Sequence, residues 1–198
     1  AMIEPLAVGL QAAEKAKIIP GETALVMGCG PIGLVIALTA LAGGCSKVFI
    51  ADIASEKLRM CENYRNLIPI DLNKENPIDV IKKNTNNWGA NIIFEASGST
   101  KAYDVIFDSI CPAGRVVIVG NPMDSVPMDF ATLLTKEIEI KTVFRYAHQY
   151  ERAINLLSSN KIDVKPMITD TVAFDDSIKA FERAAKNLPE DVKIQIQL

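Results

Sequence analysis

The sequence is poor in several residue types that would mark particular classes of protein. Only 6% of its 198 residues are aromatic, with one tryptophan, and His148 is the single histidine. The four cysteines are widely spaced, form no C-x-x-C pair, and stand at Cys29, Cys45, Cys61 and Cys111. We therefore expect reduced, partly buried thiols in a cytoplasmic protein, and no metal site of three or four ligands within this chain.

Charge of one sign and long apolar runs are also missing. The 21 basic and 24 acidic side chains nearly balance, with a formal net charge of −3, so the composition gives no reason to expect nucleic acid or an anionic membrane as a partner. No apolar run reaches the ~18 residues of a spanning helix, and no basic region precedes an apolar core at the N-terminus, so we expect no signal peptide. The chain is 49% hydrophobic, which suits one domain, or one domain plus a fragment of another.

The most informative stretch runs from Thr23 to Asp52 and reads as strand, glycine turn, helix and strand. The turn is a G-x-G-x-x-G motif, Gly28-Cys29-Gly30-Pro31-Ile32-Gly33. In a dinucleotide site the first glycine permits the sharp turn, the second lets the backbone approach a pyrophosphate, and the third lets the helix pack on the strand. Pro31 suits the first turn of a helix, whose N-terminus favours an anion.

Asp52 follows the motif at about the 20-residue spacing of a carboxylate that accepts hydrogen bonds from the adenosine ribose. A carboxylate there would repel the 2′-phosphate of NADP. The nearest cations are Lys57 and Arg59, and Lys57 is better placed to cover the adenosine edge than to neutralise a phosphate. We interpret the stretch as a site for NAD rather than NADP. The alternative is a tight packing turn without a ligand.

Helical and strand-like segments alternate up to Phe144. We expect helices over residues 4–17, 31–41, 55–65, 77–83, 100–110 and 130–134, and strands over residues 23–27, 47–51, 67–70, 91–95, 115–119 and 137–144. Ser55 and Thr100 are expected N-caps, and Pro112–Gly114 an expected turn. This alternation predicts an α/β fold: a doubly wound parallel six-stranded Rossmann sheet of order 3-2-1-4-5-6, with helices on both faces.

The pattern changes after Tyr146. There we expect a helix over residues 149–159, an extended run over 167–174, a helix over 175–187 with Ile178 and Phe181 on its apolar face, and a strand over 191–198. These elements do not continue the alternation in an obvious way. We therefore divide the chain into a linking helix (1–20), a dinucleotide-binding domain (21–146) and a C-terminal segment (147–198) that closes onto a neighbouring domain.

In a doubly wound sheet, ligand groups gather where the strands end. That rule selects five segments: Gly28–Gly33, Asp52, Ala96–Ser99, Val119–Asn121 and Val143–Tyr146. The last strand, over residues 137–144, is a candidate edge for sheet extension across a two-fold axis.

Four stretches together carry a resemblance to a known family: Met2–Gly9 (MIEPLAVG), the glycine motif, Val143–Tyr146 (VFRY) and Val164–Thr169 (VKPMIT). In this order, and over nearly the whole chain, they resemble the C-terminal part of the zinc-containing medium-chain dehydrogenases, most closely the sorbitol and xylitol (polyol) dehydrogenases. The resemblance implies an N-terminal GroES-like catalytic domain outside this chain. It also implies zinc bound there by a Cys, a His and a Glu, and assembly as a homodimer or homotetramer.

The resemblance also assigns roles to residues of this chain. It implies that Glu4 contacts the zinc-bound water and the substrate, and that Arg145 and Tyr146 face the polyol. The cofactor-binding residues it implies are Gly28, Gly30, Pro31, Ile32, Gly33, Asp52, Lys57, Val119, Gly120, Asn121, Val143, Phe144 and Arg145. From the residues alone, Glu4 is equally a favourable charge at a helix N-terminus and Arg145 a surface ion-pair residue. Relatives often carry arginine at the position of Lys57.

The implied activity is oxidation of a secondary alcohol of a polyol to a ketone, with hydride transfer to NAD and zinc as the Lewis acid. On that interpretation this chain alone is inactive. Two alternatives stay open: another zinc medium-chain dehydrogenase, acting on threonine or a simple alcohol, and a non-catalytic NAD-binding module.

Overall fold

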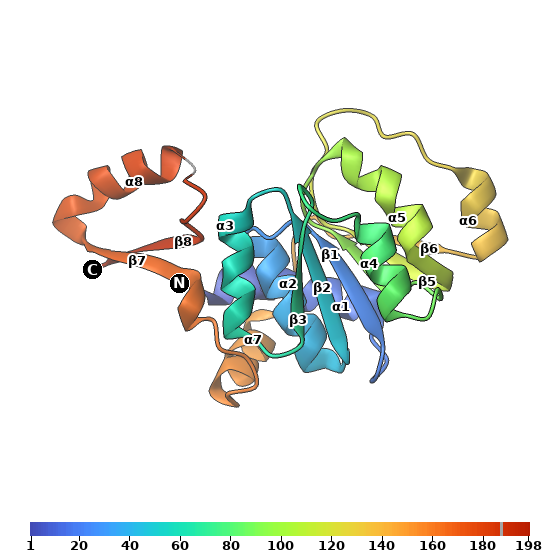
Figure 1. Cartoon of the computed structure of the whole chain (residues 1–198). Helices are drawn as coiled ribbons and strands as arrows, with labels where there is room; N and C mark the ends of the chain where they lie inside the picture. Colours follow the sequence, from blue (N-terminus) through green and yellow to red (C-terminus); the bar gives the residue numbers. More distant parts are fainter. Residues whose placement is uncertain (187) are drawn as a thin grey trace.

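The main sheet has six parallel strands in the order β3-β2-β1-β4-β5-β6 (Figure 1). This computed structural model describes residues 1–186 and 188–198. The strands are β1 (Thr23–Met27), β2 (Lys47–Asp52), β3 (Leu67–Asp71), β4 (Ala90–Glu95), β5 (Ile110–Ile118) and β6 (Glu139–Thr142). The order confirms the predicted doubly wound sheet.

Helices cover both faces of this sheet and bury two apolar cores. One face carries α1 (Ile3–Ala16), α2 (Pro31–Gly43), α3 (Ser55–Leu58) with the 3₁₀ turn Arg59–Asn63, and α7 (Tyr150–Ser158). The other face carries α4 (Pro77–Asn84) and α5 (Tyr103–Ser109), while α6 (Phe130–Lys136) precedes the edge strand β6. Because the central strands are covered on both sides, they are continuous apolar runs, as parallel strands usually are.

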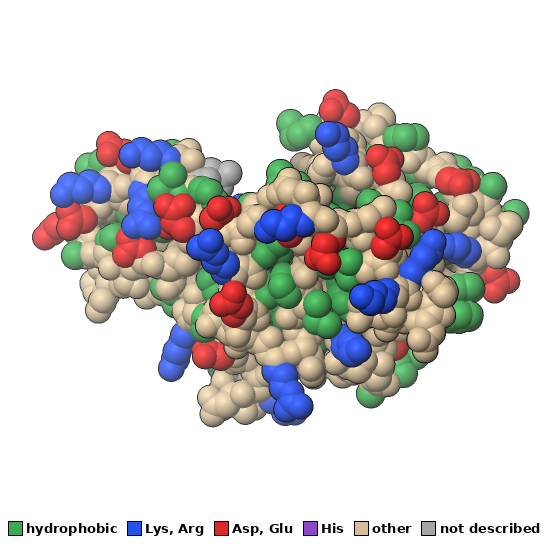
Figure 2. Space-filling model, in the orientation of Figure 1, with side chains coloured by type: hydrophobic (Ala, Val, Ile, Leu, Met, Phe, Trp, Pro, Cys, Tyr) green, Lys and Arg blue, Asp and Glu red, His purple; other side chains and the backbone are tan. Residues whose placement is uncertain are grey.

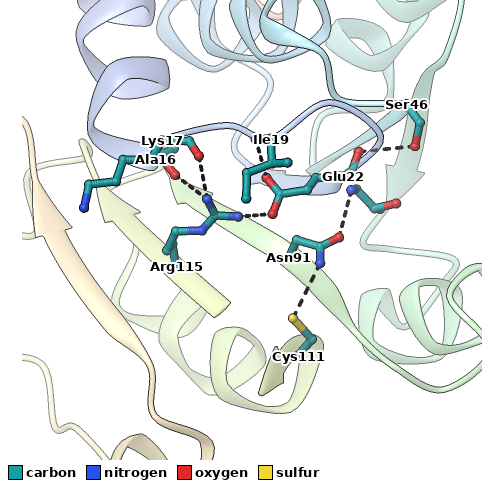
Figure 3. A network of polar contacts seen from close by, with 9 residues as sticks. Ala16, Lys17, Ile19, Glu22, Ser46, Asn91, Cys111 and Arg115 are labelled. Atoms are coloured by element: carbon teal, nitrogen blue, oxygen red, sulfur yellow. Dashed lines mark hydrogen bonds and ion pairs between the residues drawn. The ribbon is translucent and has the colours of Figure 1, made fainter. Parts of the chain in front are cut away.

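A polar network holds the C-terminal end of α1 to the sheet (Figure 3). The guanidinium of Arg115, on β5, donates to the carbonyl oxygens of Ala16 and Lys17 at 2.8 and 2.7 Å and pairs with the carboxylate of Glu22. Glu22 in turn accepts from the backbone N–H of Ile19 at 2.8 Å. The last carbonyls of α1 thus have a cation as their partner, which stabilises a helix C-terminus.

Two predicted N-caps are wrong. The N-cap of α3 is Ala54, and the Ser55 hydroxyl donates instead to the Asp71 carboxylate at 2.6 Å. The hydroxyl thus donates to an ionised acceptor, which makes a strong hydrogen bond, and this acceptor is remote in sequence. Thr100 begins a 3₁₀ turn whose cap position is Ser99, and no side chain caps it.

Two strand boundaries also differ from prediction. The expected turn at Pro112–Gly114 lies inside β5, where the register with β4 shifts and Ala113 adopts a φ of 55°. The extra residues form an irregularity of the ladder rather than a loop. The strand β6 begins at Glu139, not at residue 137, because Glu137 ends α6 in the left-handed conformation.

The C-terminal residues form a small βαβ unit apart from the main sheet (Figure 1). Its parallel strands are β7 (Ile168–Ala173) and β8 (Lys193–Gln197), joined through α8 (Ser177–Ala185). The sequence pattern did not reveal that these elements pair in this way. The predicted helix end at residue 187 lies outside the described residues.

Arg183, on α8, forms ion pairs with Asp170 on β7 and with Asp191 just before β8, both at 2.6 Å. The expected apolar face of α8 is exposed, with Ile178 73% and Phe181 69% accessible. Among the described residues, no helix combines the length and apolarity needed to cross a membrane.

Candidate functional site

A cleft of about 690 Å³ opens at the carboxyl ends of β1, β2 and β4. The strand β1 lies between β2 and β4, so the cleft lies where the strand order reverses, which is the usual ligand site of a doubly wound sheet. Its walls are the glycine turn after β1, the segment after β2 and the segment after β4. Acidic and basic side chains are interspersed over the face shown in Figure 2, with no extended patch of one sign.

The three glycines of the turn have three different surroundings. Gly28 adopts a φ of 104°, a conformation that favours glycine, and its N–H donates to the Ala51 carbonyl at 2.7 Å. A side chain on Gly30 would meet no atom within 4 Å, so the backbone there faces open space at the cleft. A Cβ on Gly33 would overlap the carbonyl oxygen of Gly28. The motif therefore predicts all three roles correctly: Gly28 makes the sharp turn, Gly30 leaves the backbone open, and Gly33 allows close packing.

The helix α2 begins beside this open space. Its N-cap is Gly30, in extended conformation, Pro31 opens the first turn, and no acidic residue occupies that turn. The first N–H groups of a helix have no partner within the helix, and its dipole favours negative charge at this end. This end of α2 can therefore receive the phosphates of a ligand in the cleft.

Asp52 is fixed by two backbone groups of the cleft wall. One carboxylate oxygen accepts from the N–H of Cys29 at 2.6 Å and the other from the N–H of Ala54 at 2.8 Å. A carboxylate offers about four acceptor positions, so two remain for the hydroxyls of a ligand. The structure thus gives Asp52 the fixed orientation that recognition of a ribose diol needs.

Cys29 fills the interior of the turn. It is buried, and the neighbouring Cys61 thiol together with burial raises the pKa of its thiol. A thiol with a raised pKa is a poor nucleophile, so the side chain is a small packing group. All four cysteines are free and buried.

The segment after β2 is anchored by a residue that the sequence reasoning missed. Asp71, at the end of β3, accepts from the Ser55 hydroxyl at 2.6 Å and pairs with Lys74 at 2.7 Å, while Asn73 donates to the Ile53 carbonyl at 2.6 Å. Lys74, Ser55 and the N–H of Asn73 hold the pKa of Asp71 well below its usual value. Its position at a strand end is the signal that could have identified it.

The segment after β4 is anchored by Glu95, which is fully buried and was also missed. Its carboxylate accepts from the N–H groups of Ser97 and Gly98 at 2.8 and 3.1 Å. Its carbonyl accepts from the N–H groups of Val119 and Gly120, both at 2.8 Å. The ends of β4 and β5 are therefore joined beside the cleft.

Of the predicted cofactor residues, Gly28, Gly30, Asp52 and Lys57 line the cleft itself. Lys101, from the segment after β4, lines it as well and was not predicted; its nearness to Ala96–Ser99 is the signal for it. The remaining predicted cofactor residues lie outside the lining: Pro31, Ile32, Gly33, Val119, Gly120, Asn121, Val143, Phe144 and Arg145.

The residues predicted to face a substrate form a second group. The hydroxyl of Tyr146 donates to Glu4 at 3.2 Å and lies 3.0 Å from the hydroxyl of Tyr150. The guanidinium of Arg145 lies 5.7 Å from the ring centre of Phe144, which is 86% exposed. Glu4 and Tyr146 are thus brought together across 142 residues, whereas Arg145 packs on its neighbour.

Within residues 1–186 and 188–198, no three side chains of His, Cys, Asp or Glu gather in a way that could hold a metal ion. The described side chains therefore do not supply a zinc site of three or four protein ligands.

Comparison with known proteins identifies the family of this chain. The chain is 44% identical to a D-xylulose reductase of Morganella morganii, covering 94% of this chain and 55% of that protein. It is 30% identical to a sorbitol dehydrogenase of Bacillus subtilis, covering 99% of this chain and 56% of that protein. The chain thus spans a little over half the length of the curated relatives it matches.

Solved structures agree with this result. The 2R,3R-butanediol dehydrogenase of Bacillus subtilis superposes with a TM-score of 0.92 at 25% identity, over 100% of this chain and 56% of that one. An Escherichia coli oxidoreductase of unknown specificity gives 0.91 at 31% identity, over 100% and 57%. The model of the family described as zinc-binding dehydrogenase matches residues 31–159, more than half of the chain. The chain therefore belongs to the zinc-binding dehydrogenase family.

Proposed function

We propose that the protein of which this chain is part is an NAD- and zinc-dependent polyol dehydrogenase. It oxidises a secondary alcohol of a sugar alcohol to a ketone by hydride transfer to NAD. The observation that carries the proposal is the cleft in which the open backbone at Gly30 and the fixed carboxylate of Asp52 lie together. Relatives named D-xylulose reductase and sorbitol dehydrogenase support the substrate class.

In this proposal the chain binds the cofactor. The pyrophosphate lies at the N-terminus of α2, and the ribose hydroxyls of the adenosine donate to Asp52. Lys57 covers the adenosine edge. Val119–Asn121 and Val143–Arg145, at the ends of β5 and β6, would hold the nicotinamide. NAD supplies the hydride acceptor, and the chain positions it.

The substrate lies toward Glu4, Arg145 and Tyr146. Zinc supplies Lewis-acid chemistry when bound. Because the described residues hold no ligand cluster for it, we propose that its ligands belong to a part of the protein outside this chain.

The remaining parts of the chain join it to that catalytic domain. We propose that residues 1–20 link to it and that residues 147–198 rejoin it, with residues 21–146 as the NAD-binding domain. The exposed side chains of Phe174, Ile178 and Phe181 are then covered by the catalytic domain, because exposed apolar groups gathered in one place mark an interface.

We further propose a cytoplasmic homodimer or homotetramer. The strand β6 is the last of the main sheet, so its outer edge is available for pairing across a two-fold axis. The free thiols suit a reducing compartment.

A substrate panel on the intact protein tests the proposal. Purified protein should contain zinc and form NADH with xylitol or sorbitol, lose that activity to a chelator, and regain it with added zinc. The 198-residue chain alone should bind NAD and oxidise no polyol. Faster oxidation of threonine or of a monohydroxy alcohol would favour another branch of the family. Cofactor binding without turnover of any substrate would favour a non-catalytic module.

A further inference from the structure

Tyr150, the first residue of α7, extends the group formed by Glu4 and Tyr146. Its hydroxyl lies 3.0 Å from that of Tyr146, and the two ring centres are 5.3 Å apart with an angle of 30° between the planes. Nothing in the sequence pattern or the family resemblance singles out this residue. The three oxygens form a row, with spacings of 3.2 and 3.0 Å.

The row has a fixed direction of hydrogen bonding. A carboxylate only accepts hydrogen bonds, and a phenol has one proton to donate. The proton of Tyr146 is used by Glu4, so Tyr150 must donate to the oxygen of Tyr146. The hydrogen bonds with Tyr150 and Glu4, together with desolvation, raise the pKa of Tyr146 to about 12, which keeps its proton in place at neutral pH.

This direction leaves acceptor positions at both ends of the row. The proton of Tyr150 is used, but its oxygen retains lone pairs, and Tyr150 is 46% exposed. The second carboxylate oxygen of Glu4 makes no hydrogen bond within the described residues. A ligand with hydroxyl groups on several adjacent carbons can donate to both ends of the row. A monohydroxy alcohol can donate to one only.

We propose that Tyr150 is a substrate-binding residue that sets the preference for polyhydroxylated substrates, because its phenol oxygen accepts a hydrogen bond from a hydroxyl remote from the reacting carbon. This inference rests on the proposed function. A site that hydrogen-bonds a substrate hydroxyl discriminates against an analogue that lacks this hydroxyl, because the acceptor then loses its partner. Tyr150 therefore favours a polyol over a simple alcohol.

The variant Tyr150→Phe in the intact protein tests the inference, because it removes the hydroxyl and keeps the ring against Tyr146. We expect kcat/KM for xylitol to fall about tenfold, mainly through KM, and by clearly more than kcat/KM for 2-butanol. In a calorimetric titration of the NAD-loaded protein, the affinity for xylitol should fall by a similar factor.

The matched control is Tyr64→Phe. The Tyr64 hydroxyl is buried and has no hydrogen-bond partner among the described residues, so its removal deletes the same atom away from the site. We expect no change in the preference for xylitol over 2-butanol. A loss in Tyr150→Phe that is equal for both substrates, or no loss for xylitol, overturns the role of Tyr150 alone. Wild-type protein that neither binds nor oxidises xylitol overturns the proposed function together with this inference.

Discussion

Gly30 and Gly33 make the glycine turn testable at the scale of single residues. A methyl group at Gly30 has open space but occupies the volume where a pyrophosphate must lie. We expect Gly30→Ala to fold with a free energy of unfolding within about 0.5 kcal/mol of wild type and to bind NAD at least tenfold more weakly, a loss of about 1.4 kcal/mol. Thermal unfolding and calorimetric titration measure the two effects.

Gly33→Ala is the contrasting variant. The added methyl overlaps the Gly28 carbonyl, and overpacking of this kind costs about 1–3 kcal/mol of stability. If both variants lost stability equally while NAD affinity stayed unchanged, the turn would be a packing device and not a ligand site.

Variants of Asp52 test the predicted preference for NAD over NADP. Asp52→Ala removes the charge that repels the 2′-phosphate, so the ratio of NAD to NADP affinity should move toward one, by about tenfold or more. Because Asp52 also accepts from the N–H groups of Cys29 and Ala54, the isosteric Asp52→Asn is measured beside it. An unchanged ratio in both variants would refute the assignment.

At the scale of elements, Asp71 anchors the segment between β2 and α3. Its pKa is held below the ordinary 3.8 by Lys74, Ser55 and Asn73, so its contribution to stability is present above pH 3.8 and is lost as the pH falls through the lower folded-state pKa. We expect Asp71→Asn to lower the thermal midpoint at pH 7 and to lose that difference in strongly acidic buffer. A difference that persists unchanged at low pH would contradict this account.

Asp71→Asn also serves as a control for the two Asp52 variants. It loosens the cleft wall while leaving the Asp52 carboxylate in place, so NAD and NADP affinities should fall together and their ratio should hold.

Removal of the Arg115 side chain tests how much its network stabilises the end of helix α1. Its ion pair with Glu22 is largely buried, with 11% and 13% of the two side chains accessible, and removal of one partner leaves the other charge unpaired. We expect Arg115→Ala to cost about 3 kcal/mol in the free energy of unfolding. The control is Arg152→Ala, whose pair with Glu14 is 52% accessible on both sides and should contribute less than ~1 kcal/mol. If denaturant titrations showed an equal loss of unfolding free energy in the two variants, Arg115 would not be what holds α1 to the sheet.

Local sequence signals predicted the elements better than their ends. Ser55 has the residue type of an N-cap, yet its hydroxyl donates to Asp71, 16 residues away. Glu137 stands at the start of the last expected strand but completes α6 in a left-handed conformation. The partner of Ser55 is remote in sequence, whereas Glu137 is held by hydrogen bonds to the carbonyls of α6 itself, so only the first difference comes from contacts outside a short window of sequence.

For the whole molecule, the order of the main sheet could be predicted because alternating strands and helices with right-handed crossovers leave few topologies. The strand-end rule then located Gly28, Gly30 and Asp52 at the cleft. Asp71 and Glu95 also lie at strand ends, but their role as anchors was missed because it depends on hydrogen bonds that form only when the strand ends meet. The pairing of β7 with β8 was missed for the same reason.

We propose that this chain carries an NAD site whose selectivity for NAD over NADP comes from Asp52. Calorimetric titration of the purified protein with NAD and with NADP, under the same buffer and salt conditions, tests it most directly. We expect saturable binding of NAD and at least tenfold weaker binding of NADP, a difference of about 1.4 kcal/mol or more. Equal or tighter binding of NADP, or no binding of NAD, would contradict it.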